Sequence, residues 1–323
     1  MQKTFFGRLC NGTDVYCYTL KNQYITAKIL NYGAIIKELL IRERNTVLGY
    51  NTLAEYETDS YYLGAVIGRV AGRISDGQLI VSDQTYQLEQ NNGNNHLHGG
   101  NQGFHKKVWS VLEYSSDKIS LTYHSLHMEE NYPGNVDIVI EYRLEGTTFI
   151  LEYQAQSDRE TVINLTNHSY FNLGDRLEDI SQHFLQINAE QFYILDANYI
   201  PKELSFVNDT PFDFRKLHRI QERLSQPHEQ LSFARGYDHL FVLQEIEPQV
   251  ILLSPDQNLM LCASTNQKYM IFYTGNFLGT DNTSFICRQG LCLEMQSINQ
   301  FGLISINPAV LYHHITKWNF QSR

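Results

Sequence analysis

The strongest constraint on the fold is a two-residue alternation of apolar and polar side chains that recurs along the chain. One run places five apolar residues at every second position: Val136, Ile138, Ile140, Tyr142 and Leu144. Tyr24–Ile29 and Ile119–Tyr123 repeat the pattern. Successive side chains of a strand point to opposite faces, so each run predicts a strand with one buried face. The 21 Tyr and 17 Phe, with many Val, Ile and Thr, suit such surfaces.

Turn dipeptides separate these runs, and helical periodicity is rare. The dipeptides at which the chain can reverse are Asp76-Gly77, Asn92-Gly93, Pro133-Gly134 and Glu145-Gly146. The best helical spacing lies in Lys216–Leu224, which predicts one short surface helix. Many strands with few helices predict an all-β fold, a large antiparallel β-sandwich. No linker or fixed-period repeat interrupts residues 1–323, so we expect a single domain.

Charge and hydropathy exclude several classes of partner. The formal net charge is -10 and no basic run occurs, which argues against nucleic acid. No stretch approaches the roughly 20 apolar residues of a membrane span. Residues 1–8 lack the apolar core of a signal peptide, so we expect a cytoplasmic protein. The five cysteines show no Cys-x-x-Cys spacing, and we expect them to be buried free thiols.

Two glycine-rich segments carry cationic or imidazole side chains. Arg69 and Arg73 interrupt an otherwise apolar run, and each must form a structural ion pair or face a ligand. The loop 91–100 contains His96-Leu97-His98, which is either half of a metal site or a source of hydrogen bonds to a ligand. Because a metal site needs a third ligand, we favour the second interpretation.

Two further segments place polar groups on strand faces. Asn164, Thr166, His168 and Tyr170 share one face if the strand that begins at Thr161 continues, and they predict the lining of a polar cleft. Glu294 shares a strand face with Cys292 and Gln296. A carboxylate inside a strand is costly unless it is paired or functional, and burial raises its pKa toward that of a working acid or base.

Together these segments resemble the galactose mutarotase (aldose 1-epimerase) family. The resemblance runs through most of the chain and rests on seven motifs: Asn31–Ala34, Gly64–Ile74, Leu97–Gly100, Asn164–Leu173, Tyr237–His239, Phe272–Phe277 and Leu293–Gln296. It implies a wide β-sandwich with an open sugar-binding face. The implied activity is interconversion of the α and β anomers of free hexoses such as galactose and glucose by acid–base ring opening and closure.

The resemblance also implies roles for single residues. Glu294 is the expected general base at the anomeric hydroxyl, His168 the general acid at the ring oxygen, and His98 a hydrogen-bonding group near that oxygen. Arg73 and Asp238 are expected to bind sugar hydroxyls, with Tyr170 as a further pocket residue. Two other positions depart from the pattern of relatives, Gly72 and Ile271, and leave the preferred sugar open.

This chemistry transfers protons only, so no metal, nicotinamide or other cofactor is expected. The expected partner is a small-molecule sugar, and the protein is expected to be a monomer or a homodimer. Two alternatives stay open: a sugar-binding module without catalysis, and an epimerase for a phosphorylated sugar, which would need further Arg or Lys residues. Phe272, Tyr273 and Phe277 either stack on the sugar or belong to the core.

Overall fold

Three antiparallel sheets dominate the computed structural model, which describes residues 2–174, 178–280, 284–297 and 305–322. The five-stranded sheet has the order β1 (Gln2–Arg8), β2 (Asp14–Lys21), β3 (Ile25–Leu30), β4 (Ile36–Ile41), β5 (Arg44–Asn45). The nine-stranded sheet has the order β11 (Ser110–Tyr114), β12 (Lys118–Ser125), β13 (Val136–Glu145), β14 (Thr148–Ser157), β28 (Tyr312–Ser322), β24 (Leu259–Thr265), β23 (Val250–Leu253), β18 (Phe184–Ile187), β21 (His218–Arg219).

The six-stranded sheet has the order β17 (Tyr170–Phe171), β26 (Leu291–Gln296), β25 (Tyr269–Tyr273), β22 (Asp238–Leu243), β19 (Ala189–Leu195), β20 (Pro201–Phe206). Short pairs complete the strands: β6 (Val66–Ile67) with β16 (Thr166–Asn167), β7 (Arg73–Ile74) with β10 (His96–Leu97), β8 (Gln78–Val81) with β9 (Gln84–Gln87), β15 (Thr161–Val162) with β27 (Ser305–Ile306). The described helices are short: α1 (Leu53–Glu57), α2 (Ile220–Leu224), α3 (Glu229–Ala234).

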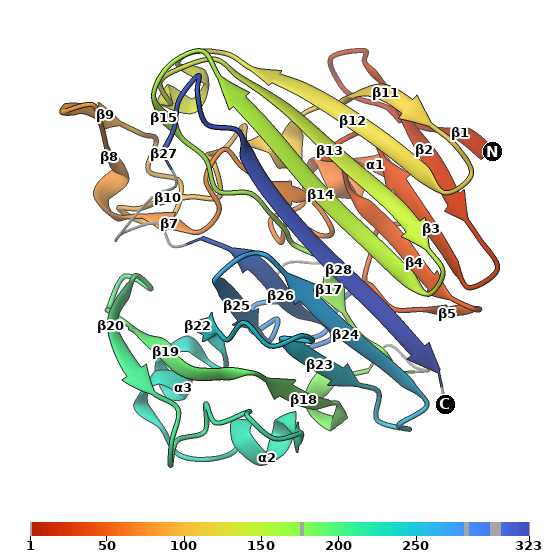
Figure 1. Ribbon diagram of the computed structural model, residues 1–323, viewed down its shortest axis with the longest axis vertical. Helices are drawn as coiled ribbons and strands as arrows, with labels where there is room; N and C mark the ends of the chain where they lie inside the picture. The colour runs from red at the N-terminus through yellow and green to blue at the C-terminus, as the bar shows by residue number, and fades with distance from the viewer. Residues whose placement is uncertain (1, 175–177, 281–283, 298–304, 323) are drawn as a thin grey trace.

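The main core lies between the nine-stranded sheet and the other two sheets. One apolar cluster joins residues of all three, for example Ile25 on β3, Ile140 on β13 and Phe241 on β22. In Figure 1 the long strands β13, β14 and β28 cross the molecule between the N-terminal strands and the strands that surround β22. The predicted all-β sandwich is confirmed, whereas a single domain over residues 1–323 stays a prediction.

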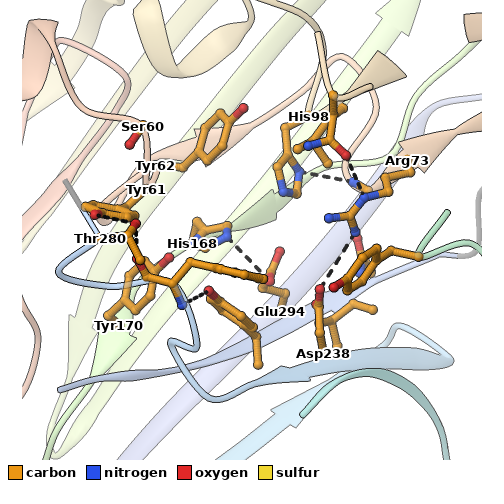
Figure 2. Close-up of a pocket in the computed structure, with 18 residues that line it drawn as sticks. Ser60, Tyr61, Tyr62, Arg73, His98, His168, Tyr170, Asp238, Thr280 and Glu294 are labelled. Atoms are coloured by element: carbon orange, nitrogen blue, oxygen red, sulfur yellow. Dashed lines mark hydrogen bonds and ion pairs between the residues drawn. The ribbon is translucent and has the colours of Figure 1, made fainter. Parts of the chain in front are cut away.

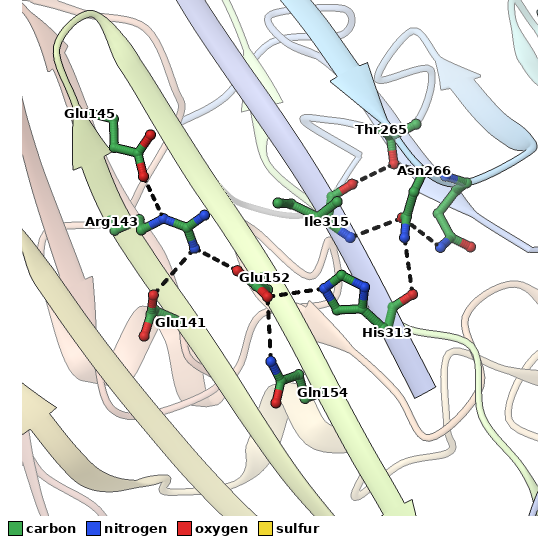
Figure 3. A network of polar contacts seen from close by, with 10 residues as sticks. Glu141, Arg143, Glu145, Glu152, Gln154, Thr265, Asn266, His313 and Ile315 are labelled. Carbon is green, nitrogen blue, oxygen red and sulfur yellow. Dashed lines mark hydrogen bonds and ion pairs between the residues drawn. The ribbon is translucent and has the colours of Figure 1, made fainter. Parts of the chain in front are cut away.

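The alternation that predicted the strands separates a buried face from a polar one. Ile140 and Tyr142 on β13 are buried in the core, whereas Arg143 on the opposite face forms ion pairs with Glu145 and Glu152 at 2.8 and 2.6 Å. His313 on β28 contacts Glu152 from the other side, with 3.0 Å between Nε2 and Oε1 (Figure 3). This face of the nine-stranded sheet therefore carries a polar network away from the core.

The predicted helix over residues 216–224 begins later than expected. His218 and Arg219 pair with Leu185 and Phe184 of β18, so the backbone is extended there and α2 starts at Ile220. The sequence analysis missed α1, although Thr52 and Glu55 form a capping box at its start. It also missed α3.

Not all thiols are buried, contrary to the expectation. Cys17 and Cys292 are buried, but Cys10 and Cys287 are exposed, and Cys262 is intermediate. All five are free. Among the described helices, none has the length and apolar character required to cross a bilayer.

Candidate active site

A pocket of about 400 Å³ opens on one face of the six-stranded sheet (Figure 2). Its floor comes from four neighbouring strands, whose register brings distant residues together. Tyr170 on β17 lies opposite Cys292 on β26, and Glu294 on β26 lies opposite Ile271 on β25. Asp238, the first residue of β22, pairs with Tyr273 of β25. Antiparallel pairing thus places side chains from four parts of the sequence around one cavity.

The faces of β26 divide cleanly between core and pocket. Leu293 and Met295 belong to the apolar core, whereas Glu294 and Gln296 line the pocket. The predicted common face of Cys292, Glu294 and Gln296 is therefore confirmed. Each of these three side chains is buried.

A second wall comes from the pair of β7 and β10. Arg73 lies opposite Leu97, and His98 follows in the left-handed backbone region with a φ of 53°. The backbone N–H of Gly72 donates a hydrogen bond to Nδ1 of His98 at 3.1 Å. Because Nδ1 accepts this bond, a neutral His98 carries its proton on Nε2 and has one N–H left to donate.

Glu294 and His168 lie next to each other on the floor of the pocket. Nε2 of His168 is 3.7 Å from Oε1 of Glu294, and the residues are 5% and 3% exposed. Nδ1 of His168 faces the thiol of Cys292 at 3.5 Å. Oε2 of Glu294 is buried and has no hydrogen-bond partner in the described part of the chain, so it is available to a ligand.

Burial moves the pKa values of this pair in opposite directions. It raises the pKa of Glu294 to about 8, with a further increase from the charge of Asp238 and an opposing effect of Arg73. It lowers the pKa of His168 to about 4. The raised pKa of the carboxyl was expected from the sequence. The lowered pKa of the His168 imidazole follows from its burial, which the sequence alone does not show.

Arg73 and Asp238 form the charged end of the pocket. Their closest atoms, Nη1 and Oδ2, are 3.8 Å apart, and Nε of Arg73 donates to Asn92 at 3.1 Å. The guanidinium also lies over the ring of Tyr199, at 5.1 Å from its centroid. Burial raises the pKa of Asp238, and Arg73 opposes that shift. The two groups offer a hydrogen-bond donor and an acceptor to a ligand with several hydroxyls.

Aromatic rings form the remaining walls. The ring of Tyr62 lies 4.8 Å from that of His98 and 5.8 Å from that of His168, so it packs against both imidazoles. Tyr273 and Phe277 line the pocket, whereas Phe272 is fully buried in the core. Tyr273 and Phe277 also pack in or against a second apolar cluster, so stacking of these two rings on a sugar stays a prediction.

The residue types also raise the question of a metal. Donor atoms of His98, His168 and Glu294 all lie within 4.8 Å of one another. However, the bond from Gly72 occupies Nδ1 of His98 and places its proton on Nε2, so this imidazole does not offer a free lone pair. The remaining imidazole and carboxylate are fewer than the three ligands typical of a catalytic zinc site. The donor set therefore does not fit a metal well.

The six residues selected from the sequence all line this pocket: Arg73, His98, His168, Tyr170, Asp238 and Glu294. His96 does not, because both ring nitrogens are used inside the protein, by the carbonyl of Glu89 and the hydroxyl of Tyr132, each at 2.7 Å. Arg69 is also structural. Its buried guanidinium donates to the backbone carbonyl groups of Pro133 and Gly134, so the structural alternative holds, with carbonyl groups in place of a carboxylate.

The predicted polar strand face over residues 164–170 was only half correct. The chain there is divided among β15, β16 and β17 rather than forming one strand. His168 and Tyr170 reach the pocket, but Asn164 accepts a hydrogen bond from the backbone of Ser297, and Thr166 is not part of the lining.

The sequence analysis did not select several residues of the lining, among them Tyr62, Asn92, Tyr199 and Gln296. Two of these left a signal, since Asn92 belongs to the Asn/Gly loop and Gln296 shares a strand face with Glu294. Tyr62 left none. Its position depends on a left-handed backbone conformation, with a φ of 58°, that a single sequence does not reveal.

Comparisons with known proteins agree with this geometry. The model of the family described as aldose 1-epimerase matches residues 16–308. The chain is 34% identical to a galactose mutarotase of Sus scrofa, with 98% of each chain covered. It is 35% identical to an aldose 1-epimerase of Haemophilus influenzae, over 89% of this chain and 88% of the relative.

A solved structure extends the similarity to the fold. The galactose 1-epimerase of Lactobacillus acidophilus superimposes with a TM-score of 0.91 at 31% identity, over 99% of this chain and 98% of that one. The matched motifs and the pocket residues lie within the same span of sequence. The chain therefore belongs to the aldose 1-epimerase family.

Proposed function

We propose that this protein is an aldose 1-epimerase, an isomerase that interconverts the α and β anomers of free hexoses such as galactose and glucose. The observation that carries the proposal is the contact between Glu294 and His168 at 3.7 Å on the floor of a pocket large enough for a hexose. The two oxygens that exchange protons in this reaction are bonded to the same carbon. An acid and a base that serve both must therefore lie close together.

The reaction is a bifunctional proton transfer. The Glu294 carboxylate removes the proton of the anomeric hydroxyl, while the His168 imidazolium gives a proton to the ring oxygen. The bond between C1 and the ring oxygen breaks, and an aldehyde forms at C1. After the C1–C2 bond rotates, the imidazole takes the proton back from the chain hydroxyl as that oxygen attacks the other face of C1. Glu294 gives its proton to the former aldehyde oxygen, which becomes the new anomeric hydroxyl, so both groups end as they began.

The opposite pKa shifts suit this cycle. A carboxyl with a raised pKa is a stronger base when ionised, and an imidazolium with a lowered pKa is a stronger acid. In the open-chain stage the proton lies on Glu294 and the imidazole is neutral, which is the distribution that burial favours. His98 lines the same pocket, and because Gly72 occupies its Nδ1, its Nε2–H is a neutral donor for the ring oxygen.

Arg73 and Asp238 are proposed to bind sugar hydroxyls at the other end of the pocket, and Tyr170 to form part of its wall. Arg73 is the single Lys or Arg among the described lining residues, and it already contacts Asp238 and Asn92. A phosphorylated substrate would need more cationic partners than this. A free sugar is therefore favoured over a sugar phosphate.

Polarimetry tests the proposal directly. Freshly dissolved α-galactose or α-glucose should reach its equilibrium rotation faster in the presence of the protein. No cofactor should be needed, and a chelator should not reduce the rate. A protein that binds the sugar without accelerating its mutarotation would instead be the binding module considered above.

The plot of kcat/KM against pH should be bell-shaped, with midpoints at about pH 4 and about pH 8, which are the pKa values of His168 and Glu294. Below the lower limb both Glu294 and His168 are protonated and no base remains; above the upper limb both have lost their protons and no acid remains. The measurement is the enzymatic rate across this range after subtraction of the buffer rate, with circular dichroism to confirm folding at each end. A single limb near 6.5 would contradict these assignments.

A further inference from the structure

A small side cavity continues from the sugar pocket past Arg73 and Asp238. Its volume is about 40 Å³, and it adjoins the pocket, because the two share lining residues that include Arg73, Asp238, Ile271 and Gln296. Its remaining walls include the apolar side chains of Leu195, Pro201 and Leu240. This volume admits a group of a few atoms but not a second sugar ring.

Gln296 lies at the junction of the two spaces with an unsatisfied polar atom. Its side chain is 3% exposed, and its Oε1 is buried without a hydrogen-bond partner among the described residues. A buried amide oxygen without a partner is costly, and most such atoms in folded proteins are paired. No donor for this oxygen is found among the described residues, and a ligand in the pocket can supply one.

The chemistry of the site selects a hydroxyl group. Oε1 of Gln296 accepts a hydrogen bond from an O–H, and the apolar walls suit the C–H groups that carry a sugar hydroxyl. Gln296 follows Glu294 by two residues on one strand face, so their Cα atoms lie roughly 7 Å apart. Gln296 lines the side cavity, whereas Glu294 and His168 line only the main pocket. A hydroxyl held in the side cavity is therefore on the part of the ring away from C1, on C3, C4 or C6.

We infer that Gln296 is a further substrate-binding residue, which accepts a hydrogen bond from one distal hydroxyl of the aldose in the side cavity. It thereby selects sugars that carry this hydroxyl over analogues that lack it. The inference rests on the proposed function and adds a determinant of substrate preference to it. The other side-chain acceptors among the described lining residues of the cavity are the carboxyl of Asp238 and the hydroxyls of Tyr199 and Ser297.

A scan of deoxy sugars tests the inference with wild-type protein and Gln296→Leu, which removes the amide but keeps the volume. The sugars are galactose and its 2-, 3-, 4- and 6-deoxy analogues, and kcat/KM is measured by polarimetry. With the wild type, kcat/KM should be about 10-fold lower than for galactose for one of the three distal analogues, which are the 3-, 4- and 6-deoxy sugars. Gln296→Leu should lower kcat/KM about 10-fold relative to the wild type for galactose and for 2-deoxygalactose. For the distal analogue that lacks the recognised hydroxyl, its kcat/KM should be close to that of the wild type.

The controls separate this inference from the proposed function. Gln154→Leu makes the same change on the outer face of β14 and should leave every rate unchanged. If the wild type accelerates no sugar, the proposed function fails. If it accelerates galactose but Gln296→Leu lowers kcat/KM equally for all five sugars, or for none, the inference alone is overturned. If that variant does not fold, a wild type that treats the three distal analogues alike also overturns the inference.

Discussion

Replacement of Glu294 by Gln should lower kcat for mutarotation by about 100- to 10,000-fold. The amide has the shape of the carboxyl but cannot take the proton of the anomeric hydroxyl. Glu294 is 3% exposed, and burial lowers the pKa of the neighbouring His168 to about 4, so at neutral pH the amide replaces no ion pair between these two side chains. We therefore expect an unfolding temperature close to that of the wild type, measured by circular dichroism, beside the loss of rate measured by polarimetry.

The chain offers a matched control for this variant. Glu152 also contacts an imidazole, that of His313 at 3.0 Å, but on the outer face of the nine-stranded sheet (Figure 3). Burial raises the pKa of Glu152, but hydrogen bonds from Arg143 and His313 outweigh burial and leave the pKa lowered. Glu152→Gln should leave the rate unchanged. A Glu294→Gln protein that retains more than a fifth of the wild-type rate would exclude Glu294 as the general base.

Local patterns in the sequence predicted those parts of the site that lie on regular strands. The alternation on β26 placed Glu294 and Gln296 on one face away from Leu293, because strand geometry alone determines that separation. The same rule was only partly correct at residues 164–170. The backbone does not stay in one strand there, and of the four predicted residues only His168 and Tyr170 reach the pocket. Periodicity predicts a face only for as long as the backbone remains extended.

Tertiary contacts determined what the sequence could not show. The role of Asp238 came only from the family resemblance, since one acid before an apolar strand is a weak signal; its place beside Arg73 depends on two segments more than 160 residues apart in the sequence. The pKa of His168 depends on its burial among rings from separate parts of the chain, among them Tyr62, which lies in a segment with no recognisable pattern, and Tyr273. The protonation states of the site residues are therefore determined by tertiary packing rather than by any sequence motif.

Replacement of His168 by Asn should lower kcat by a factor similar to that of Glu294→Gln, about 100- to 10,000-fold, because no acid then reaches the ring oxygen. The limb of the pH profile at about 4 should disappear with the imidazole. Asn is smaller than His, and the rings of Tyr62 and Tyr170 pack against this imidazole, so a modest fall in unfolding temperature is expected. His313→Asn, which changes the imidazole that contacts Glu152 on the outer face of the sheet, should alter neither the mutarotation rate nor the pH profile.

The double variant of Glu294 and His168 distinguishes a cooperating pair from two independent contributions. If one proton transfer depends on the other, the double variant should be slowed about as much as the slower single variant. Independent groups would instead multiply their effects, to between about 10⁴- and 10⁸-fold. The 3.7 Å separation of Nε2 and Oε1 predicts the first result, because both side chains then act on oxygens bonded to one carbon. Multiplied effects would mean that the two groups assist separate steps and would remove the basis of the bifunctional mechanism.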